Sequence, residues 1–211
     1  SQFIKPKYAL ILNVSKDHLD WHGGMQNYIK SKFKIFKNQK KTDFAFLNEK
    51  KLIKKFKKDN CKSKLKIVSM RSYKLIEEKI TNKYLKSKAN QKNTTFVYEL
   101  SKLFKVDDIQ FINACNKFKG LSHRQEIFLK KRNITFINDS KATSFESCKQ
   151  ALYSSKNIYW ILGGLPKKGD KVSLSKYKSN IIKCYLIGKN INFFKNQIKG
   201  KLAFSITKNL K

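Results

Sequence analysis

Two acidic residues and two histidines directly follow the first apolar run of the chain. The run YALILNV covers residues 8–14, and Asp17, His18, Asp20 and His22 come after it. Carboxylates and imidazoles bind divalent metal ions, and ligands bind at the carboxyl ends of strands in open α/β sheets. His18 therefore suits a metal ligand at a strand end. The alternatives are a loop histidine with a local hydrogen bond and a zinc site built with His22, but the pair lacks the glutamate of an HExxH motif.

Three segments further along the chain each carry a cationic side chain that could do chemistry. The segments are GLSHRQE with Arg124, INDSKATS with Lys141, and ILGGLPKKGD with Lys167. Cations at the ends of strands attract phosphate and carboxylate groups. The chain contains neither a Gly-rich loop ending in Gly-Lys-Ser/Thr nor a GxGxxG fingerprint, so nucleotide binding would need other devices.

Structural roles compete with chemical ones at several of these positions. Arg124 could pair with Glu126 or Asp139, and Asp139-Ser140 could cap the helix that follows. We expect His123 to be structural, and we expect Gly163-Gly164 to make a tight turn after a buried strand.

An alternation of short apolar runs and helical patterns positions these residues. The expected strands cover residues 8–14, 44–47, 65–70, 134–137, 158–162, 184–187 and 202–206. The expected helices cover residues 25–36, 94–104, 108–118, 145–153 and 174–182. This alternation predicts an α/β fold with parallel strands. Lysines are dense and glycines absent over residues 32–119, which places a domain junction near Gly120.

The net charge is large, because 48 lysines and arginines face 14 acidic residues, which gives 48 − 14 = +34. Only three of the 48 are arginines, whereas proteins that read nucleic acid favour arginine. The lysines are spread along the whole chain, and abundant Lys, Asn, Ile, Phe and Tyr indicate a genome with strong base bias. A basic α/β nucleic-acid-binding module remains an alternative, but we expect no specific nucleic-acid partner.

The cysteines and the apolar runs bound the class of protein. Cys61, Cys115, Cys148 and Cys184 form no CxxC pair, so we expect reduced thiols rather than a zinc site or a disulfide framework. No apolar run approaches the ~20 residues that a membrane span needs. We therefore expect a soluble cytoplasmic protein without a membrane partner.

The segment after the first strand resembles the Mur ligase family. The matching residues are Asn13, Val14, Ser15, Asp17, His18, Asp20, Tyr28 and Lys32. The three later segments are similar to the branch of this family that adds D-glutamate to UDP-N-acetylmuramoyl-L-alanine. The resemblance implies an ATP-dependent amide ligase of peptidoglycan synthesis, with ATP and magnesium as cofactors and those two compounds as substrates.

The resemblance also implies a role for each candidate site residue. His18, Lys32 and Lys141 would be catalytic, with His18 and a carbamylated Lys32 holding magnesium. ATP would contact Asn90, Asn93, Arg124, Asp139 and Lys141, and D-glutamate would contact Thr143 and Lys167. Carbamylation needs a neutral amine, so we expect Lys32 to be desolvated with a lowered pKa. Ala89 stands where the family has a histidine before Asn90.

The resemblance implies two incomplete domains. Residues 1–119 would be the later part of a central P-loop-type ATPase domain, and residues 120–211 an incomplete Rossmann-like C-terminal ligase domain. Closure near Gly120 would bring Arg124, Lys141 and Lys167 to the side of His18 and Lys32. The family's phosphate loop would lie upstream of Ser1, so we expect an internal piece of the enzyme. We also expect a monomer. A catalytically inactive ligase fragment is the second alternative.

Overall fold

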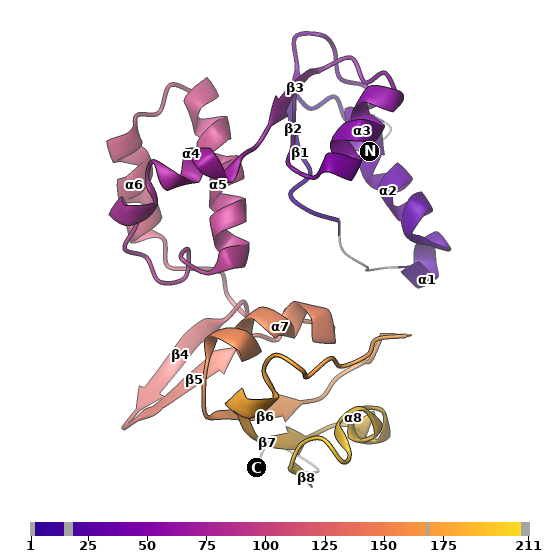
Figure 1. Cartoon of the computed structure of the whole chain (residues 1–211), viewed down its shortest axis with the longest axis vertical. Helices are drawn as coiled ribbons and strands as arrows, with labels where there is room; N and C mark the ends of the chain where they lie inside the picture. The colour runs from indigo at the N-terminus through magenta and orange to yellow at the C-terminus, as the bar shows by residue number, and fades with distance from the viewer. Residues whose placement is uncertain (1–2, 15–18, 168, 208–211) are drawn as a thin grey trace. The chain divides into compact units, whose positions relative to one another are not determined.

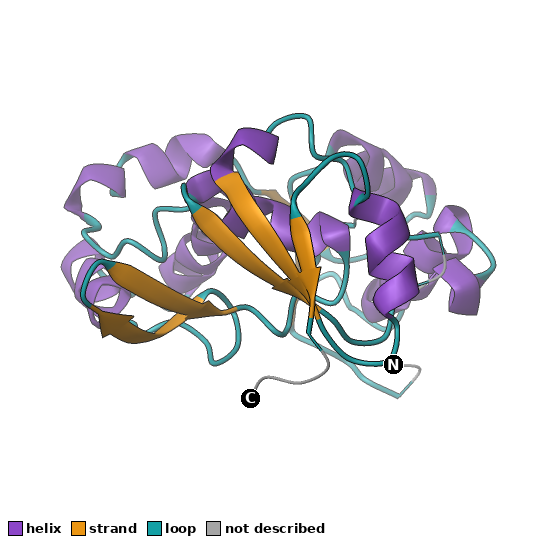
Figure 2. Cartoon of the chain, turned by 90° about the horizontal axis from the view of Figure 1, so that it is seen from below, coloured by secondary structure: helices purple, strands orange, loops and turns teal. Residues whose placement is uncertain are grey.

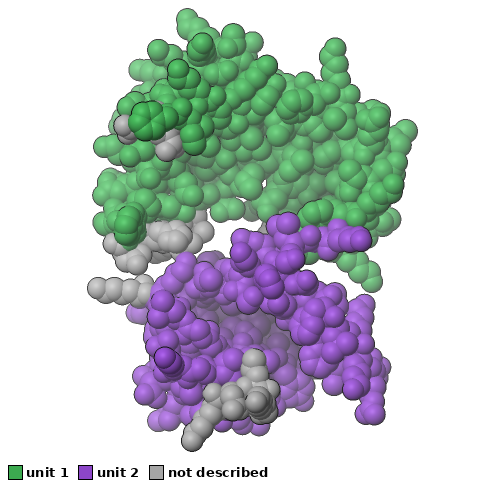
Figure 3. Space-filling view, turned by 180° about the vertical axis from the view of Figure 1, so that it is seen from behind, with its two compact units in different colours: residues 1–118 green, residues 119–211 purple. Residues whose placement is uncertain are grey.

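The computed structural model describes residues 3–14, 19–167 and 169–207 of the chain. The chain forms two compact units, Ser1–Phe118 and Lys119–Lys211, which meet in the sequence beside Gly120 (Figure 3). Each unit has its own strands, helices and buried cluster. None of the helices in the described ranges combines the length and the apolar character needed to cross a bilayer.

Unit 1 is built on a parallel sheet of three short strands (Figure 1). The strands are β1 (Tyr8–Leu10), β2 (Phe44–Leu47) and β3 (Lys64–Ile67), in that spatial order. Helix α2 (Met25–Phe33) and the 3-10 turn η1 (Lys34–Phe36) connect the first two, and α3 (Lys50–Lys58) connects the next. A short helix, α1 (Leu19–His22), precedes α2.

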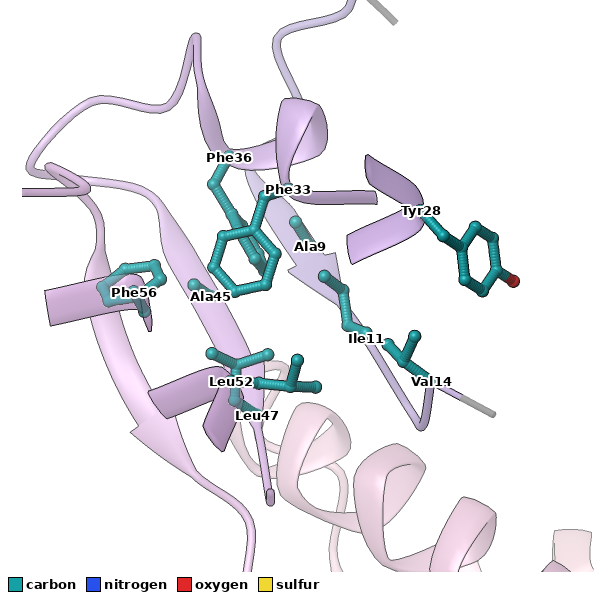
Figure 4. Packing of buried hydrophobic residues seen from close by; sticks show 10 residues of the cluster. All are labelled: Ala9, Ile11, Val14, Tyr28, Phe33, Phe36, Ala45, Leu47, Leu52 and Phe56. Carbon is teal, nitrogen blue, oxygen red and sulfur yellow. The ribbon is translucent and has the colours of Figure 1, made fainter. Parts of the chain in front are cut away.

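Both faces of this sheet are covered, which explains the nearly continuous apolar runs of its strands. On one face, strand residues pack with aromatic side chains from α2, η1 and α3; the buried cluster is Ala9, Ile11, Val14, Tyr28, Phe33, Phe36, Ala45, Leu47, Leu52 and Phe56 (Figure 4). On the other face, Phe46 and Val68 pack with Phe96 of α5 (Lys88–Leu103). Alternate residues of β2 therefore belong to different clusters.

The rest of unit 1 is helical. Helices α4 (Met70–Lys74), α5 and α6 (Asp108–Lys117), with the 3-10 turn η2 (Glu77–Lys79), enclose a separate cluster. Asp107 begins α6 by accepting a hydrogen bond from the backbone N–H of Gln110 at 2.7 Å.

Unit 2 contains an antiparallel hairpin and a second parallel sheet (Figure 2). The hairpin joins β4 (Glu126–Lys131) to β5 (Ile134–Asn138). The sheet has the order β6 (Ile158–Leu162), β7 (Ile181–Leu186), β8 (Phe204–Ile206). Helices α7 (Phe145–Ser154) and α8 (Ile191–Ile198) pack on it around the fully buried Cys184.

The expected α/β class with parallel strands is confirmed, but several expected bounds are not. The helix expected over residues 174–182 is wrong, since this segment holds only the 3-10 turn η3 (Lys178–Asn180) before β7 begins at Ile181. Leu174, Tyr177 and Ile181 are buried at helical spacing. The spacing therefore identified the buried side chains correctly, although the backbone is not an α-helix. Strand β1 ends at Leu10 rather than at residue 14, and the sequence did not predict β4 or α8.

Candidate functional site

A polar hollow opens at the carboxyl ends of β1 and β2 in unit 1. Its volume is about 290 Å³, and it is lined by Leu12, Asn13, Asn48, Glu49, Lys92 and Asn93. The first two follow β1, the next two follow β2, and the last two lie on α5. This is the edge of a parallel sheet at which ligands bind, and its volume is near the lower end of small-molecule sites, about 300 Å³. Of the sequence-predicted residues, the hollow includes Asn93.

Glu49 connects the ends of two neighbouring strand segments at this hollow. Its Oε1 atom accepts a hydrogen bond from the backbone N–H of Val14 at 3.3 Å, across 35 residues of sequence. Its other carboxylate oxygen pairs with Lys51 at 3.1 Å. Val14 is the last described residue before the predicted metal ligand His18, which lies outside the described residues together with Ser15 and Asp17.

Asn48 and Glu49 are functional candidates that the sequence analysis missed. The Oδ1 atom of Asn48 is buried and has no hydrogen-bond partner among the described residues. A buried acceptor without a partner costs about 1–3 kcal/mol, and Asn48 is also one of the residues that line the hollow. The available signal was position alone, because both residues follow a buried strand as Asn13 does.

Lys32 lies on α2 beside Tyr28, one helical turn away. Its Nζ atom is 5.3 Å from the centre of the Tyr28 ring, and that ring lies 5.1 Å from the ring of His22. The side chain of Lys32 is exposed, not desolvated as carbamylation was expected to require. Carbamylation of Lys32 therefore stays a prediction, and unit 1 by itself does not supply the burial.

Asn90 and Asn93 have different surroundings at the start of α5. The side-chain amide of Asn90 donates to the carbonyl of Tyr84 at 2.8 Å, and its backbone N–H donates to the hydroxyl of the N-cap residue Ser87 at 3.4 Å. Asn90 therefore stabilises the first turn of the helix. Asn93, less than one turn further on, lines the hollow.

In unit 2, two predicted segments that are separated in sequence are joined by hydrogen bonds. The backbone N–H of Gln125 donates to Oδ1 of Asp139 at 3.0 Å, and the backbone N–H of Lys141 donates to the carbonyl of His123 at 3.1 Å. Asn138 contacts Nδ1 of His123 at 2.9 Å. Arg124, Asp139 and Lys141 are thus brought to one region of unit 2.

The loop around Arg124 has an unusual backbone. His123 and Gln125 both adopt positive φ angles, 63° and 48°, which are uncommon for residues other than glycine. His123 donates its backbone N–H to Glu126 at 2.8 Å and contacts Asn138, which agrees with the structural role expected for it. Such conformations cluster at functional sites.

Asp139 is partly buried between these two segments. Burial raises the pKa of its carboxyl group above the ordinary value, while the Gln125 N–H and the charge of Arg124 oppose that shift. Within the described ranges, no ion pair shorter than 4 Å joins Arg124 to Asp139 or Glu126, so the salt-bridge alternative is not observed. The guanidinium is exposed.

The alternative role of Asp139-Ser140 as a helix cap is not observed, because Ser144 caps α7. Ser144 and Ser147 exchange hydrogen bonds in a capping box. Thr143 is exposed immediately before this cap. The next backbone N–H, that of Phe145, donates to Asp170 at 2.9 Å, which ties the start of α7 to the loop that carries Lys167. The two residues predicted to contact D-glutamate therefore lie on connected loops.

Gly163 and Gly164 make the tight turn after β6 that the sequence predicted. A Cβ atom on Gly163 would lie 2.6 Å from Cγ1 and 2.8 Å from the carbonyl oxygen of Ile187. Gly164 has a φ of 101°, and its carbonyl accepts a hydrogen bond from Asn190 at 2.9 Å. The turn thus passes close to the end of β7 and leads into the loop of Lys167.

The described residues do not gather three His, Cys, Asp or Glu side chains at one place, as a protein-only metal site would need. Within the same ranges the four cysteines are free thiols. Burial, with the charges of Asp139 and Asp170, raises the pKa of Cys148 to about 12, so this thiol stays protonated.

Comparison with known proteins supplies independent evidence about the family to which the chain is similar. Residues 1–116 match the family described as Mur ligase middle domain. Proteins named UDP-N-acetylmuramoylalanine--D-glutamate ligase are similar along most of the chain: the one from Wolbachia sp. subsp. Brugia malayi is 35% identical and covers 95% of it. The one from Rickettsia prowazekii is 30% identical and covers 97%. The chain spans about half the length of these relatives, 43% and 50% respectively.

Solved structures support the fold. MurF from Acinetobacter baumannii superposes with a TM-score of 0.66 at 14% identity, over 95% of this chain and 51% of that one. MurF ligase from Thermotoga maritima, solved in complex with ADP, gives a TM-score of 0.65 at 12% identity, over 97% of this chain and 53% of that one. At these identities the likeness concerns the fold alone.

Proposed function

The chain belongs to the Mur ligase family, and on that premise we propose that it is part of an ATP-dependent ligase that adds D-glutamate to UDP-N-acetylmuramoyl-L-alanine. The observation that carries the proposal is the joining of the segments around Arg124 and Asp139–Lys141 through Gln125 and His123. The names of the similar proteins support this choice of substrates.

The proposed reaction has two steps. A carboxylate oxygen of the alanine attacks the γ-phosphorus of ATP, so that an acyl phosphate forms and ADP leaves. The amine nitrogen of D-glutamate then attacks the acyl carbon, the amide forms, and phosphate leaves as the nitrogen loses a proton. Both steps place extra negative charge on oxygen atoms, which cations stabilise.

We assign residues of this chain to parts of the substrates by their charge and position. We assign the nucleoside part of ATP to the hollow with Asn93, and phosphate oxygens to Arg124 and Lys141. Thr143 and Lys167, on the connected loops of unit 2, would hold the carboxylates of D-glutamate. Bound magnesium would neutralise phosphate charge, with His18 and a carbamylated Lys32 as the proposed ligands. Asp139 would orient this region through its bond to Gln125.

Because the proposed reaction uses ATP, we propose that the protein acts in the cytoplasm. We also propose that it is a monomer. Because the chain spans about half of its relatives, an inactive fragment is the second candidate for the 211 residues alone. We expect the isolated chain to release no ADP from ATP in the presence of UDP-N-acetylmuramoyl-L-alanine and D-glutamate. Clear turnover by the isolated chain would contradict the fragment interpretation.

The ligase proposal is tested by an ADP-release assay on the protein produced from the whole source gene, not on the 211-residue chain. D-Glutamate should support turnover, whereas L-glutamate, L-lysine and D-alanyl-D-alanine should not. A Lys141→Gln variant should lose turnover, while Lys130→Gln on strand β4 removes an equal charge and should keep it. Equal use of another amino acid would overturn the proposed substrate.

A further inference from the structure

A row of aromatic and basic side chains crosses the sheet of unit 1 at the amino ends of its strands. Tyr8, Phe44 and Lys64 are the first residues of β1, β2 and β3, and they are direct partners in the pairing of the three strands. Paired residues point to the same face of a sheet. The hollow that includes Asn93 lies at the opposite, carboxyl ends of β1 and β2, so the row is separate from the proposed ligase site.

The rings of this row contact each other and continue to the end of α5. The rings of Tyr8 and Phe44 are nearly parallel, at 13°, and their centres are 5.7 Å apart. The ring of Phe104, the residue that follows α5, lies 5.1 Å from that of Tyr8. These are the distances of packed aromatic pairs. Phe104 is 57% exposed, whereas Tyr8 and Phe44 are half-buried beneath it, so the three rings form a surface with one open ring.

Three lysines lie beside these rings. The Nζ atom of Lys7 is 5.8 Å from the centre of the Tyr8 ring. The Nζ atoms of Lys64 and Lys66 are 5.7 Å and 6.0 Å from the centre of the Phe44 ring. All three lysines are exposed, and within the described ranges none of them has a carboxylate within 4 Å. We name the three rings and the three lysines the aromatic-lysine platform.

The acidic residues next to the platform in sequence are already engaged. The carboxylate of Asp43, directly before Phe44, accepts a hydrogen bond from the backbone N–H of Lys40 at 2.6 Å. On α5, Glu99 pairs with Lys102 at 3.1 Å. The free charges of the platform are therefore positive, and they lie beside rings. This combination is complementary to a partner that carries both phosphate groups and flat rings.

We propose that the aromatic-lysine platform binds single-stranded nucleic acid without reading its sequence. Unpaired bases stack on exposed aromatic rings, and lysines attract the phosphate groups that link them. A base would stack on Phe104, and the lysines would contact the neighbouring phosphates. Because every base has a ring face, this mode of binding does not need the arginine contacts to base edges that sequence readers use. It therefore agrees with a chain in which only three of 48 basic residues are arginines.

Two other polyanions fit the platform less well. A duplex keeps its base faces stacked inside the helix, and an acidic membrane surface offers phosphate groups without flat rings. Both would use the lysines of the platform and leave the exposed ring of Phe104 without a stacking partner. Duplex and membrane binding are therefore alternative outcomes of the experiments below.

Binding is tested on the 211-residue chain by fluorescence anisotropy, with a labelled oligouridylate of about ten nucleotides in about 0.15 M NaCl. The matched probe is an abasic strand of the same length, which keeps the phosphates and lacks the bases. The oligouridylate should bind about tenfold more tightly than the abasic strand, which corresponds to one stacked base. It should also bind more tightly than a duplex of the same length. Equal affinity for the oligouridylate and either other probe would overturn the proposal.

A substitution at the open ring tests stacking directly. Phe104→Leu keeps an apolar side chain, so it should weaken oligouridylate binding about tenfold and leave the affinity for the abasic strand unchanged. The matched control is Phe128→Leu on β4, where the wild-type ring is 61% exposed, and it should change neither affinity. Equal weakening of oligouridylate binding by the two variants would show that Phe104 has no special role and would contradict the proposal.

A second pair of variants tests the lysines and does not depend on the ring. Lys64→Gln combined with Lys66→Gln should weaken oligouridylate binding about tenfold and reduce its salt dependence. Lys54→Gln combined with Lys58→Gln removes an equal charge from α3, which packs on the other face of the sheet, and should change the affinity less. An equal effect of the two double variants would show general charge attraction and overturn the proposal.

Vesicles of phosphatidylglycerol distinguish a membrane from a nucleic acid. They should displace the oligouridylate only weakly, and Phe104→Leu should not alter their binding. If the vesicles displace the strand readily and Phe104→Leu weakens vesicle binding as much as strand binding, the platform binds a membrane surface and the proposal is wrong.

Discussion

The backbone N–H of Gln125 donates to the carboxylate of Asp139 at 3.0 Å. This hydrogen bond joins the segment that carries Arg124 to the segment that carries Lys141. Gln125 reaches this carboxylate because its own φ is 48° and that of His123 is 63°. The same turn places the guanidinium of Arg124 near Asp139 without a close ion pair. Asp139 is thus held mainly by a backbone donor, in a partly buried position.

Asp139→Asn should change the pH dependence of stability. Burial raises the folded-state pKa of Asp139, so the folded protein binds this proton more tightly than the unfolded chain does. The contribution of this proton to the stability of the fold is fully present below the unfolded-state pKa of about 3.9. It is lost as pH rises through the folded-state pKa. Thermal unfolding between pH 4 and pH 7 should therefore show the variant gaining stability over the wild type as pH rises.

The control for this change is Asp59→Asn, which removes an equal charge from a surface pair with Lys55 at 2.8 Å. That variant should lose a little stability near neutral pH, because a favourable pair is broken. If Asp139→Asn behaves as Asp59→Asn does, burial of the Asp139 carboxyl is not the dominant effect.

The positions of the polar residues could be predicted from sequence, but their mutual contacts could not. Asn13, Asp139 and Gly163 each follow an apolar strand, and strand ends are recognisable from composition. The bond from Gln125 to Asp139 depends on positive φ angles at His123 and Gln125, and neither residue type signals that conformation. Tertiary structure imposes it.

The missed and misplaced elements have similar physical reasons. Leu174 and Tyr177 have helical spacing because both point into one core, yet the Asn180 side chain bonds across to α7 and the chain then enters β7. Spacing of buried residues reports which side chains face the core, and it does not by itself determine the backbone. Glu49 was missed because its bond to Val14 spans 35 residues.

Gly163→Ala should destabilise unit 2 by about 1–3 kcal/mol, the range for an overpacked site. The added methyl group would lie 2.6 Å from Cγ1 and 2.8 Å from the carbonyl oxygen of Ile187. Urea unfolding measures the loss. Adding Ile187→Ala should restore only part of it, because the backbone carbonyl remains; full recovery would show that the side chain alone caused the clash.

Added salt should raise the unfolding temperature by several degrees, because the net charge of +34 makes the folded chain repel itself. Raising NaCl from about 0.01 M to about 0.15 M shortens the screening length from about 30 Å to about 8 Å. On α3, Lys54 and Lys58 are exposed and unpaired among the described residues. Replacing both with Gln should reduce the salt dependence, and an unchanged dependence would contradict lysine repulsion as its cause.

Two asparagines of α5 should separate folding from nucleotide binding. Asn90→Ala removes the bond to Tyr84 and should lower the free energy of unfolding by about 1 kcal/mol. Asn93→Ala should leave stability nearly unchanged, since this residue lines the hollow, and should weaken ADP binding about tenfold. Thermal unfolding and calorimetric titration with ADP measure the two effects on the same protein preparations. If Asn90→Ala loses ADP affinity while Asn93→Ala retains it, the nucleoside does not occupy the hollow beside Asn93.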